Sequence, residues 1–72
     1  MSVEVSVTIR VNGDQRRVPA GISVAEMLRE IGIDPAKVAV ERNLEIVPRS
    51  MLEQVLVEDV DAYEIVHFVG GG

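Results

Sequence analysis

The chain has 72 residues, of which 47% are hydrophobic and 26% charged, and it contains no cysteine. This length suits one domain with a single apolar core and excludes two domains. Without cysteine the chain has no disulfide, thiolate zinc site or cysteine nucleophile. Seven basic residues against twelve acidic ones give a net charge of −5, so nucleic acid is a poor candidate partner.

No apolar run approaches the roughly 20 residues that a membrane span needs. The first residues, Met1-Ser2-Val3-Glu4, lack the charged and then apolar segments of a signal peptide. We therefore expect a soluble, cytoplasmic protein that has no membrane partner.

The first predicted element is a β-hairpin. Apolar residues occupy every second position from Val3 to Val11, which predicts a half-buried strand. Asn12-Gly13 tolerates the positive φ of a tight primed turn, so the chain should reverse into a second strand around Arg16 to Val18. Pro19-Ala20-Gly21 should end that strand, because proline has no amide donor.

A helix is predicted after the hairpin. Ser23 and Glu26 have the spacing of a capping box, which marks a helix start. Gly32 is the expected stop. One apolar stripe should pack on the sheet, formed by Val24, Met27, Leu28 and Ile31.

Three more strands are predicted, at Lys37–Glu41, Leu44–Val47 and Tyr63–Val69. The segment from Arg49 to Val57 is ambiguous, with at most one helical turn near Met51 to Gln54. An acidic turn is expected at Glu58-Asp59-Val60-Asp61.

This order of elements predicts an α+β domain, with one main helix across a mixed sheet of four to five strands. A ubiquitin-like β-grasp is the natural candidate. The domain should cover residues 1–69, and residues 70–72 should form a flexible Gly-Gly-Gly tail.

Motifs for catalysis or ligand binding are scarce. The sequence contains no phosphate-binding loop and no pair of histidines for a metal. His67 is expected to be an ordinary strand residue, and Arg16-Arg17 a solvated hairpin edge rather than an anion site. An acidic set follows Arg49, the last basic residue, and consists of Glu53, Glu58, Asp59, Asp61 and Glu64. It is either a solvated surface or a docking surface for a basic partner.

The most unusual segment is the end, Gly70-Gly71-Gly72. These residues have no side chains with which to pack on the core, and fully extended they reach roughly 10 Å beyond it. A thread this narrow can enter a tunnel and deliver a terminal carboxylate to another protein's active site; a frayed terminus is the alternative. A carboxylate reacts only after activation, for instance as an acyl-adenylate. ATP, magnesium and the phosphate clamp would then belong to a partner, and this chain would carry no cofactor.

Three segments carry a resemblance to a known family: Val38-Ala39-Val40-Glu41 with Asn43, Glu45-Ile46-Val47-Pro48-Arg49-Ser50, and Glu64 to Gly72. Together with the Val-Asn-Gly hairpin they resemble the ThiS family, the sulfur carrier proteins of thiamine thiazole synthesis. The resemblance spans the whole chain. One departure is Val60, which lies where the family usually has glycine, so the geometry of this turn is left open.

The resemblance implies a β-grasp fold and a non-enzymatic carrier. Gly72 would be adenylated by a ubiquitin-activating-type adenylyltransferase and converted to a thiocarboxylate, with Gly70 and Gly71 as the thread. The sulfur would come from a persulfide donor such as a cysteine desulfurase, and the recipient would be thiazole synthase.

Strand parity predicts a docking surface beside the tail. If Tyr63 and Ile65 face the core, Glu64, Val66 and Phe68 face outward, with Ala39 next to them on the neighbouring strand. We expect Val66 and Phe68 to be the main anchors and the acidic residues to form a rim. The alternative is that a bulge folds Phe68 into the core.

Two other functions remain open at this stage. One is the related small subunit of molybdopterin synthase, which has the same terminal chemistry and a different acceptor. The other is a non-catalytic β-grasp binding module with an inert tail. An enzyme is the least favoured interpretation, because no nucleophile is paired with a base.

Overall fold

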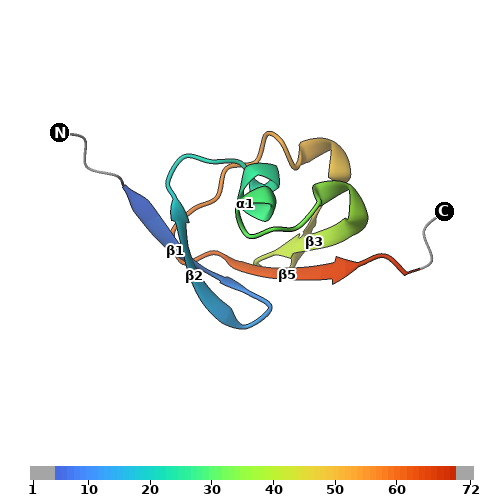
Figure 1. The fold of residues 1–72 in the computed structure, drawn as a ribbon, viewed down its shortest axis with the longest axis horizontal. Helices are drawn as coiled ribbons and strands as arrows, with labels where there is room; N and C mark the ends of the chain where they lie inside the picture. The colour runs from blue at the N-terminus through green and yellow to red at the C-terminus, as the bar shows by residue number, and fades with distance from the viewer. Residues whose placement is uncertain (1–4, 70–72) are drawn as a thin grey trace.

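In the computed structural model, which describes residues 5–69, one α-helix lies across one face of a five-stranded sheet (Figure 1). The helix α1 spans Val24–Glu30, and two 3₁₀ helices follow, η1 at Pro35–Lys37 and η2 at Arg49–Met51. The strands are β1 (Ser6–Val11), β2 (Asp14–Pro19), β3 (Val38–Arg42), β4 (Glu45–Val47) and β5 (Ala62–His67).

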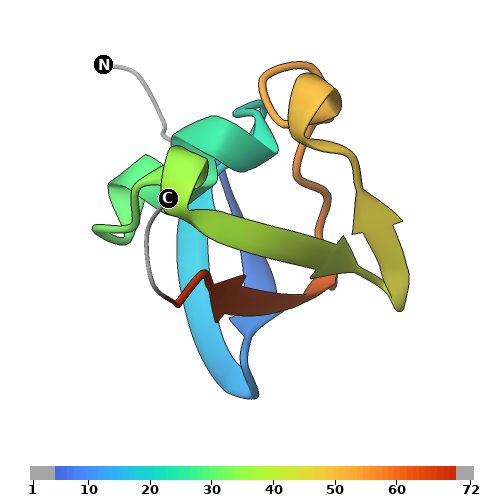
Figure 2. The ribbon, with the colours of Figure 1, turned by 90° about the vertical axis from the view of Figure 1, so that its right-hand side faces the viewer.

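The strand order is β2-β1-β5-β3-β4. The central strands β1 and β5 run parallel, and the other neighbours are antiparallel. Figure 2 shows β5 passing between β1 and β3 beneath the helix. The predicted α+β architecture, a mixed sheet with one helix across it, is confirmed.

The β1–β2 hairpin turns at Asn12-Gly13, as predicted. Both residues have positive φ, 50° and 87°, which a primed two-residue turn requires. β1 is shorter at its start than the apolar alternation suggested, because Val5 is exposed and precedes the strand, and Val3 lies outside the described residues. β2 is longer than expected and includes Pro19, whose position at the strand end requires no amide donor.

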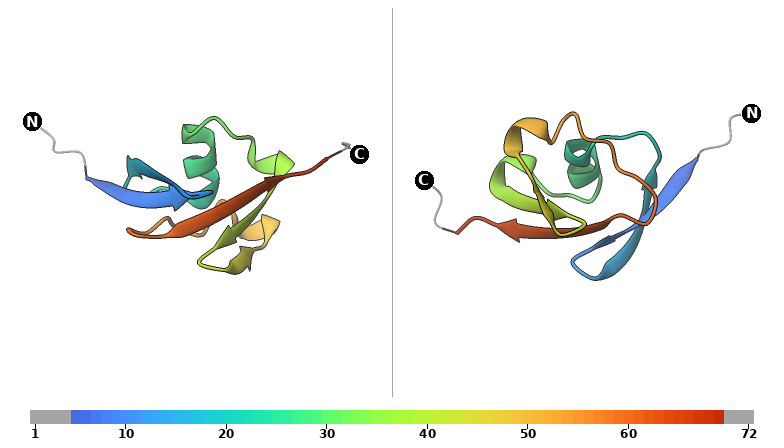
Figure 3. Two further views of the ribbon diagram at one scale, coloured as in Figure 1. Left: turned by 90° about the horizontal axis from the view of Figure 1, so that it is seen from below. Right: turned by 180° about the vertical axis from the view of Figure 1, so that it is seen from behind.

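The helix begins as predicted. The Ser23 hydroxyl accepts a hydrogen bond from the Glu26 amide, and the Glu26 carboxylate accepts one from the Ser23 amide. The apolar stripe of α1 packs on the inner face of the sheet, where it meets Ile9, Val18, Val40 and Tyr63 in a single buried core. Among the described residues, no helix covers the opposite face of the sheet (Figure 3, left).

Further element boundaries differ from those predicted, and β3 lies one residue later than expected, at Val38–Arg42. The 3₁₀ helix η2 lies at Arg49–Met51, and the turn expected near Met51 to Gln54 follows it, because the Met51 carbonyl accepts from the Gln54 and Val55 amides. β4 starts at Glu45, because Asn43 and Leu44 both adopt positive φ and form the turn from β3. β5 ends at His67 and not at Val69.

The acidic turn adopts a geometry that favours glycine. Val60 has a φ of 62° and an exposed fraction of 83%. The turn is fixed by its neighbours, because the Val60 amide donates to the Thr8 carbonyl and the Thr8 amide donates to the Asp59 carboxylate. A β-branched side chain is strained in this left-handed region, so the backbone shape is imposed by these contacts.

Candidate docking site at the end of β5

β5 is the strand that leads to the C-terminus, and its register with β3 sets which side chains face outward. Ala39 lies opposite Val66, and Glu41 lies opposite Glu64. Tyr63 and Ile65 are buried in the core, and Glu64 is exposed. The side chains of β5 therefore alternate between the core and the outer face as predicted.

The uncovered face of the sheet carries a small apolar patch near the end of β5. Val66 is 64% exposed, and Ala39 beside it is also exposed. Ile46 is exposed on β4, whose register places it opposite Glu41. Ile46 was not among the predicted site residues, because its position two strands away from β5 follows from the sheet order, which the sequence does not give.

Phe68 follows the last residue of β5. Its amide donates to the Lys37 carbonyl at 3.0 Å, which ties the chain to the start of β3. The side chain is 54% exposed and is not part of the buried core, so no bulge folds it inward. It borders a groove together with β3, β4 and η2, lined by residues that include Val38, Val47, Pro48 and Leu52.

The side chain of Arg49 contacts the ring of Phe68. Its guanidinium carbon lies 5.2 Å from the centre of the Phe68 ring, within the range of a cation–π contact. Its Nη1 also donates to the Ala36 carbonyl at 2.9 Å. The contact between Arg49 and Phe68 was not predicted from the sequence, because it joins residues nineteen positions apart and has no local sequence signal.

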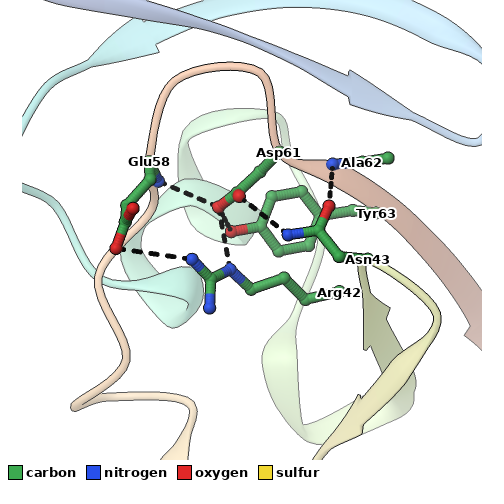
Figure 4. Close-up of polar contacts among 6 residues, drawn as sticks. All are labelled: Arg42, Asn43, Glu58, Asp61, Ala62 and Tyr63. Atoms are coloured by element: carbon green, nitrogen blue, oxygen red, sulfur yellow. Dashed lines mark hydrogen bonds and ion pairs between the residues drawn. The ribbon is translucent and has the colours of Figure 1, made fainter.

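Asp61 anchors the start of β5 and is not a surface residue. It is 5% exposed, and its carboxylate accepts hydrogen bonds from Arg42, Asn43, the Glu58 amide and the Tyr63 hydroxyl (Figure 4). The Asn43 side chain in turn accepts from the Ala62 amide. This network fixes the turn and the first residues of β5.

The expectation of an acidic surface is wrong for Asp61, whereas Glu53, Glu58, Asp59 and Glu64 are exposed as expected. Asp61 is buried, and Asp59 binds the Thr8 amide. Cations from other elements are also present: Glu53 pairs with Arg29, and Glu58 lies 3.6 Å from Arg42. Glu64 remains at the rim of the apolar patch.

Burial and hydrogen bonds in this network shift the pKa values of Asp61 and Tyr63. Burial disfavours the ionised form of Asp61, but the hydrogen bonds from Arg42, the Glu58 amide, Asn43 and Tyr63 outweigh it and hold the pKa of Asp61 below its ordinary value. Burial, and then the hydrogen bond to Asp61, raises the pKa of Tyr63. Asp61 is thus an ionised structural carboxylate.

The remaining candidates have ordinary positions. His67 is exposed at the end of β5 opposite Val38, and Arg16 and Arg17 are exposed on β2. Within residues 5–69, no three side chains of the His, Cys, Asp and Glu types gather as a metal site would require. No helix in the described part of the chain is long and apolar enough to cross a membrane. The predicted tail, Gly70 to Gly72, lies outside the described residues.

Comparison with known proteins decides the family. The model of the ThiS family matches residues 9–72. The chain belongs to the ThiS family of sulfur carriers. The resemblance seen in the sequence is thereby confirmed over nearly the whole chain.

Several relatives of this ThiS-family chain are known. "Sulfur carrier protein ThiS" of Bacillus subtilis is 40% identical over 50 residues, covering 69% of this chain and 76% of its own. A "Thiazole synthase" of Paramagnetospirillum magneticum is 55% identical over 62 residues, covering 86% of this chain. This chain spans only about a fifth of the length of that thiazole synthase and of a second one, from Magnetococcus marinus.

Solved structures agree with the family and the fold. The crystal structure of a thiamine biosynthesis protein, ThiS, from Geobacter metallireducens superposes with a TM-score of 0.74 at 33% identity, covering 92% of this chain and all of that one. A designed protein based on human ubiquitin superposes with a TM-score of 0.52 at 11% identity. The second likeness concerns the fold alone and confirms the ubiquitin-like β-grasp.

Proposed function

We propose that this chain carries sulfur for the thiazole of thiamine on its C-terminal residue, Gly72. The observation that carries the proposal is the family match, which extends through the three terminal glycines. Residues 70–72 act as a thread that enters a partner's active site, and residues 1–69 act as the domain that the partner grips. The match to the ThiS model favours this pathway over the molybdopterin alternative.

The chemistry takes place on the terminal carboxylate. A carboxylate oxygen of Gly72 attacks the α-phosphorus of ATP, and pyrophosphate leaves to give an acyl-adenylate. The terminal sulfur of a protein persulfide then attacks the acyl carbon and displaces AMP. A thiol reduces the resulting acyl disulfide, which releases the thiocarboxylate.

Every catalytic group in these steps is supplied by partners. ATP and magnesium bind a ubiquitin-activating-type adenylyltransferase, and the persulfide is formed by a donor such as a cysteine desulfurase. The chain itself is a protein co-substrate. The net charge of this chain is −5, which favours docking on a basic protein surface and disfavours direct binding of a nucleotide.

The docking surface is the apolar patch beside the tail. Val66 on β5 and Phe68 just after the strand end are large, exposed apolar side chains, and Ala39 extends the patch onto β3. Glu64 provides a charged rim on the same face. An apolar centre with a polar rim is typical of protein interfaces, and its position aligns the tail with the partner's site.

The recipient of the sulfur is thiazole synthase. Two proteins of that name contain a segment similar to this chain that makes up about a fifth of their length. The presence of both parts in one polypeptide supports a functional association between a ThiS-like domain and thiazole formation.

Growth of a bacterial strain that lacks its own ThiS tests the proposal. The full chain should restore growth without thiamine, and a chain lacking Gly71 and Gly72 should not. Leu56→Ala serves as the matched control, because Leu56 is exposed and is not part of the apolar patch. Growth supported by the shortened chain would contradict the proposal.

A further inference from the structure

The backbone of β5 presents two edges. The even-numbered residues turn their amides and carbonyls toward β3, as the bond from the Phe68 amide to the Lys37 carbonyl shows. The odd-numbered residues turn theirs toward β1, because the Asp61 and Tyr63 carbonyls accept from the Arg10 and Asn12 amides. Alternation of this kind is inherent in a strand.

The edge toward β1 is only partly covered. The parallel pairing of β1 with β5 stops at Tyr63, because β1 reverses at Asn12-Gly13. The Asn12 side chain then continues the ladder by one step. Its Oδ1 accepts from the Ile65 amide at 2.7 Å, and its Nδ2 donates to the Ile65 carbonyl at 3.1 Å.

The next backbone groups on this edge belong to His67. Within residues 5–69, neither β1 nor the Asn12 side chain reaches this position. By the alternation above, the His67 amide and carbonyl face away from β3, and no backbone hydrogen bond outside the strand ladders joins them to a described residue. His67 and its neighbours Val66 and Phe68 are exposed. An open strand edge thus lies directly before the tail, in continuity with the apolar patch.

We propose that this edge at His67 accepts an extended segment of the adenylating partner as an added strand. The inference rests on the proposed function, because it concerns how the partner grips the domain that presents Gly72. Unpaired amides and carbonyls on a strand edge are satisfied best by another extended backbone. A strand added there would run beside the tail and fix its direction into the partner's site.

A partner strand fits this edge better than a second copy of the chain. One residue supplies a single donor and a single acceptor, which is far below the contact that a stable dimer needs. A strand of the adenylating partner at His67 can be part of a larger interface, since the exposed side chains of Val66 and Phe68 lie directly beside it.

Replacement of one backbone amide by an ester tests the proposal. A synthetic chain with the ester at His67 loses the donor on the open edge and keeps a weaker acceptor at the Val66 carbonyl, whereas an ester at Glu41 loses a donor inside the β3–β5 ladder. The His67 ester should weaken binding to the adenylating enzyme about tenfold. The Glu41 ester should lower the melting temperature and leave the affinity within about twofold. Equal affinities of the two esters would overturn the proposal.

Hydrogen exchange gives a second measurement on the unmodified chain. The Ile65 amide should be protected in the free chain, and the His67 amide should become protected only when the adenylating enzyme is added. Fast exchange at His67 in the complex would overturn the proposal. So would a His67 ester that alters only self-association of the free chain, which would assign the edge to a second copy.

The failure of this inference is distinguishable from failure of the proposed function. Thiocarboxylate formation by the unmodified chain is measured in the same preparations. If sulfur is loaded and His67 stays unprotected in the complex, the carrier function stands and the added strand is wrong.

Discussion

The guanidinium of Arg49 lies over the ring of Phe68, 5.2 Å from its centre, and so joins η2 to the last residues before the tail. Arg49 also donates a hydrogen bond to the Ala36 carbonyl within η1. Two short helical turns therefore set the position of the side chain that we propose as the main anchor. This relationship makes the docking surface testable one residue at a time.

Phe68→Ala should weaken binding to the adenylating enzyme by about 30-fold, because loss of a central anchor at an interface costs about 2 kcal/mol. The measurement is calorimetric titration, with the fold checked by circular dichroism. Leu56→Ala is the matched control, since Leu56 is 53% exposed and Phe68 54%. An unchanged affinity of Phe68→Ala would remove it as an anchor.

Arg49→Gln should weaken the same binding by about threefold, because an exposed cation–π contact contributes about 0.5–1 kcal/mol. If Arg49 acts by positioning Phe68, the double variant should bind no more weakly than Phe68→Ala alone. Additive losses in this double-mutant cycle would show that Arg49 contacts the partner independently.

Val60→Gly should stabilise the domain by about 1 kcal/mol. A valine at a φ of 62° carries strain of about 1–2 kcal/mol, from which the entropy cost of glycine, about 0.5–1 kcal/mol, must be subtracted. Thermal melting should show a rise of about 4–8 °C. Val66→Gly is the control and should destabilise, because Val66 lies within a regular strand. A fall in melting temperature for Val60→Gly would refute the strain.

The stability of the domain should fall in acid through Asp61. Its pKa is lower in the folded than in the unfolded chain, so its contribution is complete above the ordinary value of 3.8 and is lost as the pH falls through the folded pKa. Denaturant unfolding across this range measures it.

Asp61→Asn isolates this contribution. At pH 7 the variant should lose about 2–3 kcal/mol, because Arg42 keeps its charge without the partner carboxylate. Its stability should also fall less steeply in acid. Equal slopes for the variant and the parent chain would exclude Asp61 as the titrating group.

The features that local rules control could be predicted from the sequence. The hairpin at Asn12-Gly13 and the helix start at Ser23 depend on a few adjacent residues, and both are present. The alternation in β5 placed Val66 on the open face. The last strand was predicted too long, because β-branched and aromatic residues continue to Val69 although the strand ends at His67.

Features that depend on distant partners could not be predicted. In the sequence, Asp61 has the signature of a solvated carboxylate. Its burial depends on Arg42, at the end of β3, and Asn43, in the turn that follows, which both donate hydrogen bonds to it. The side-chain ladder of Asn12 on Ile65 joins residues 53 positions apart. Both features arise from the order of the sheet, which spacing alone does not determine.

Intact-mass analysis tests the central claim most directly. The chain is incubated with the adenylating enzyme, ATP, magnesium and a persulfide donor, and its mass is compared with that of a chain lacking Gly71 and Gly72. We expect the full chain to gain the difference in mass between one sulfur and one oxygen, and the shortened chain to be unchanged. An unchanged mass for the full chain, or the same gain in the shortened one, would contradict it.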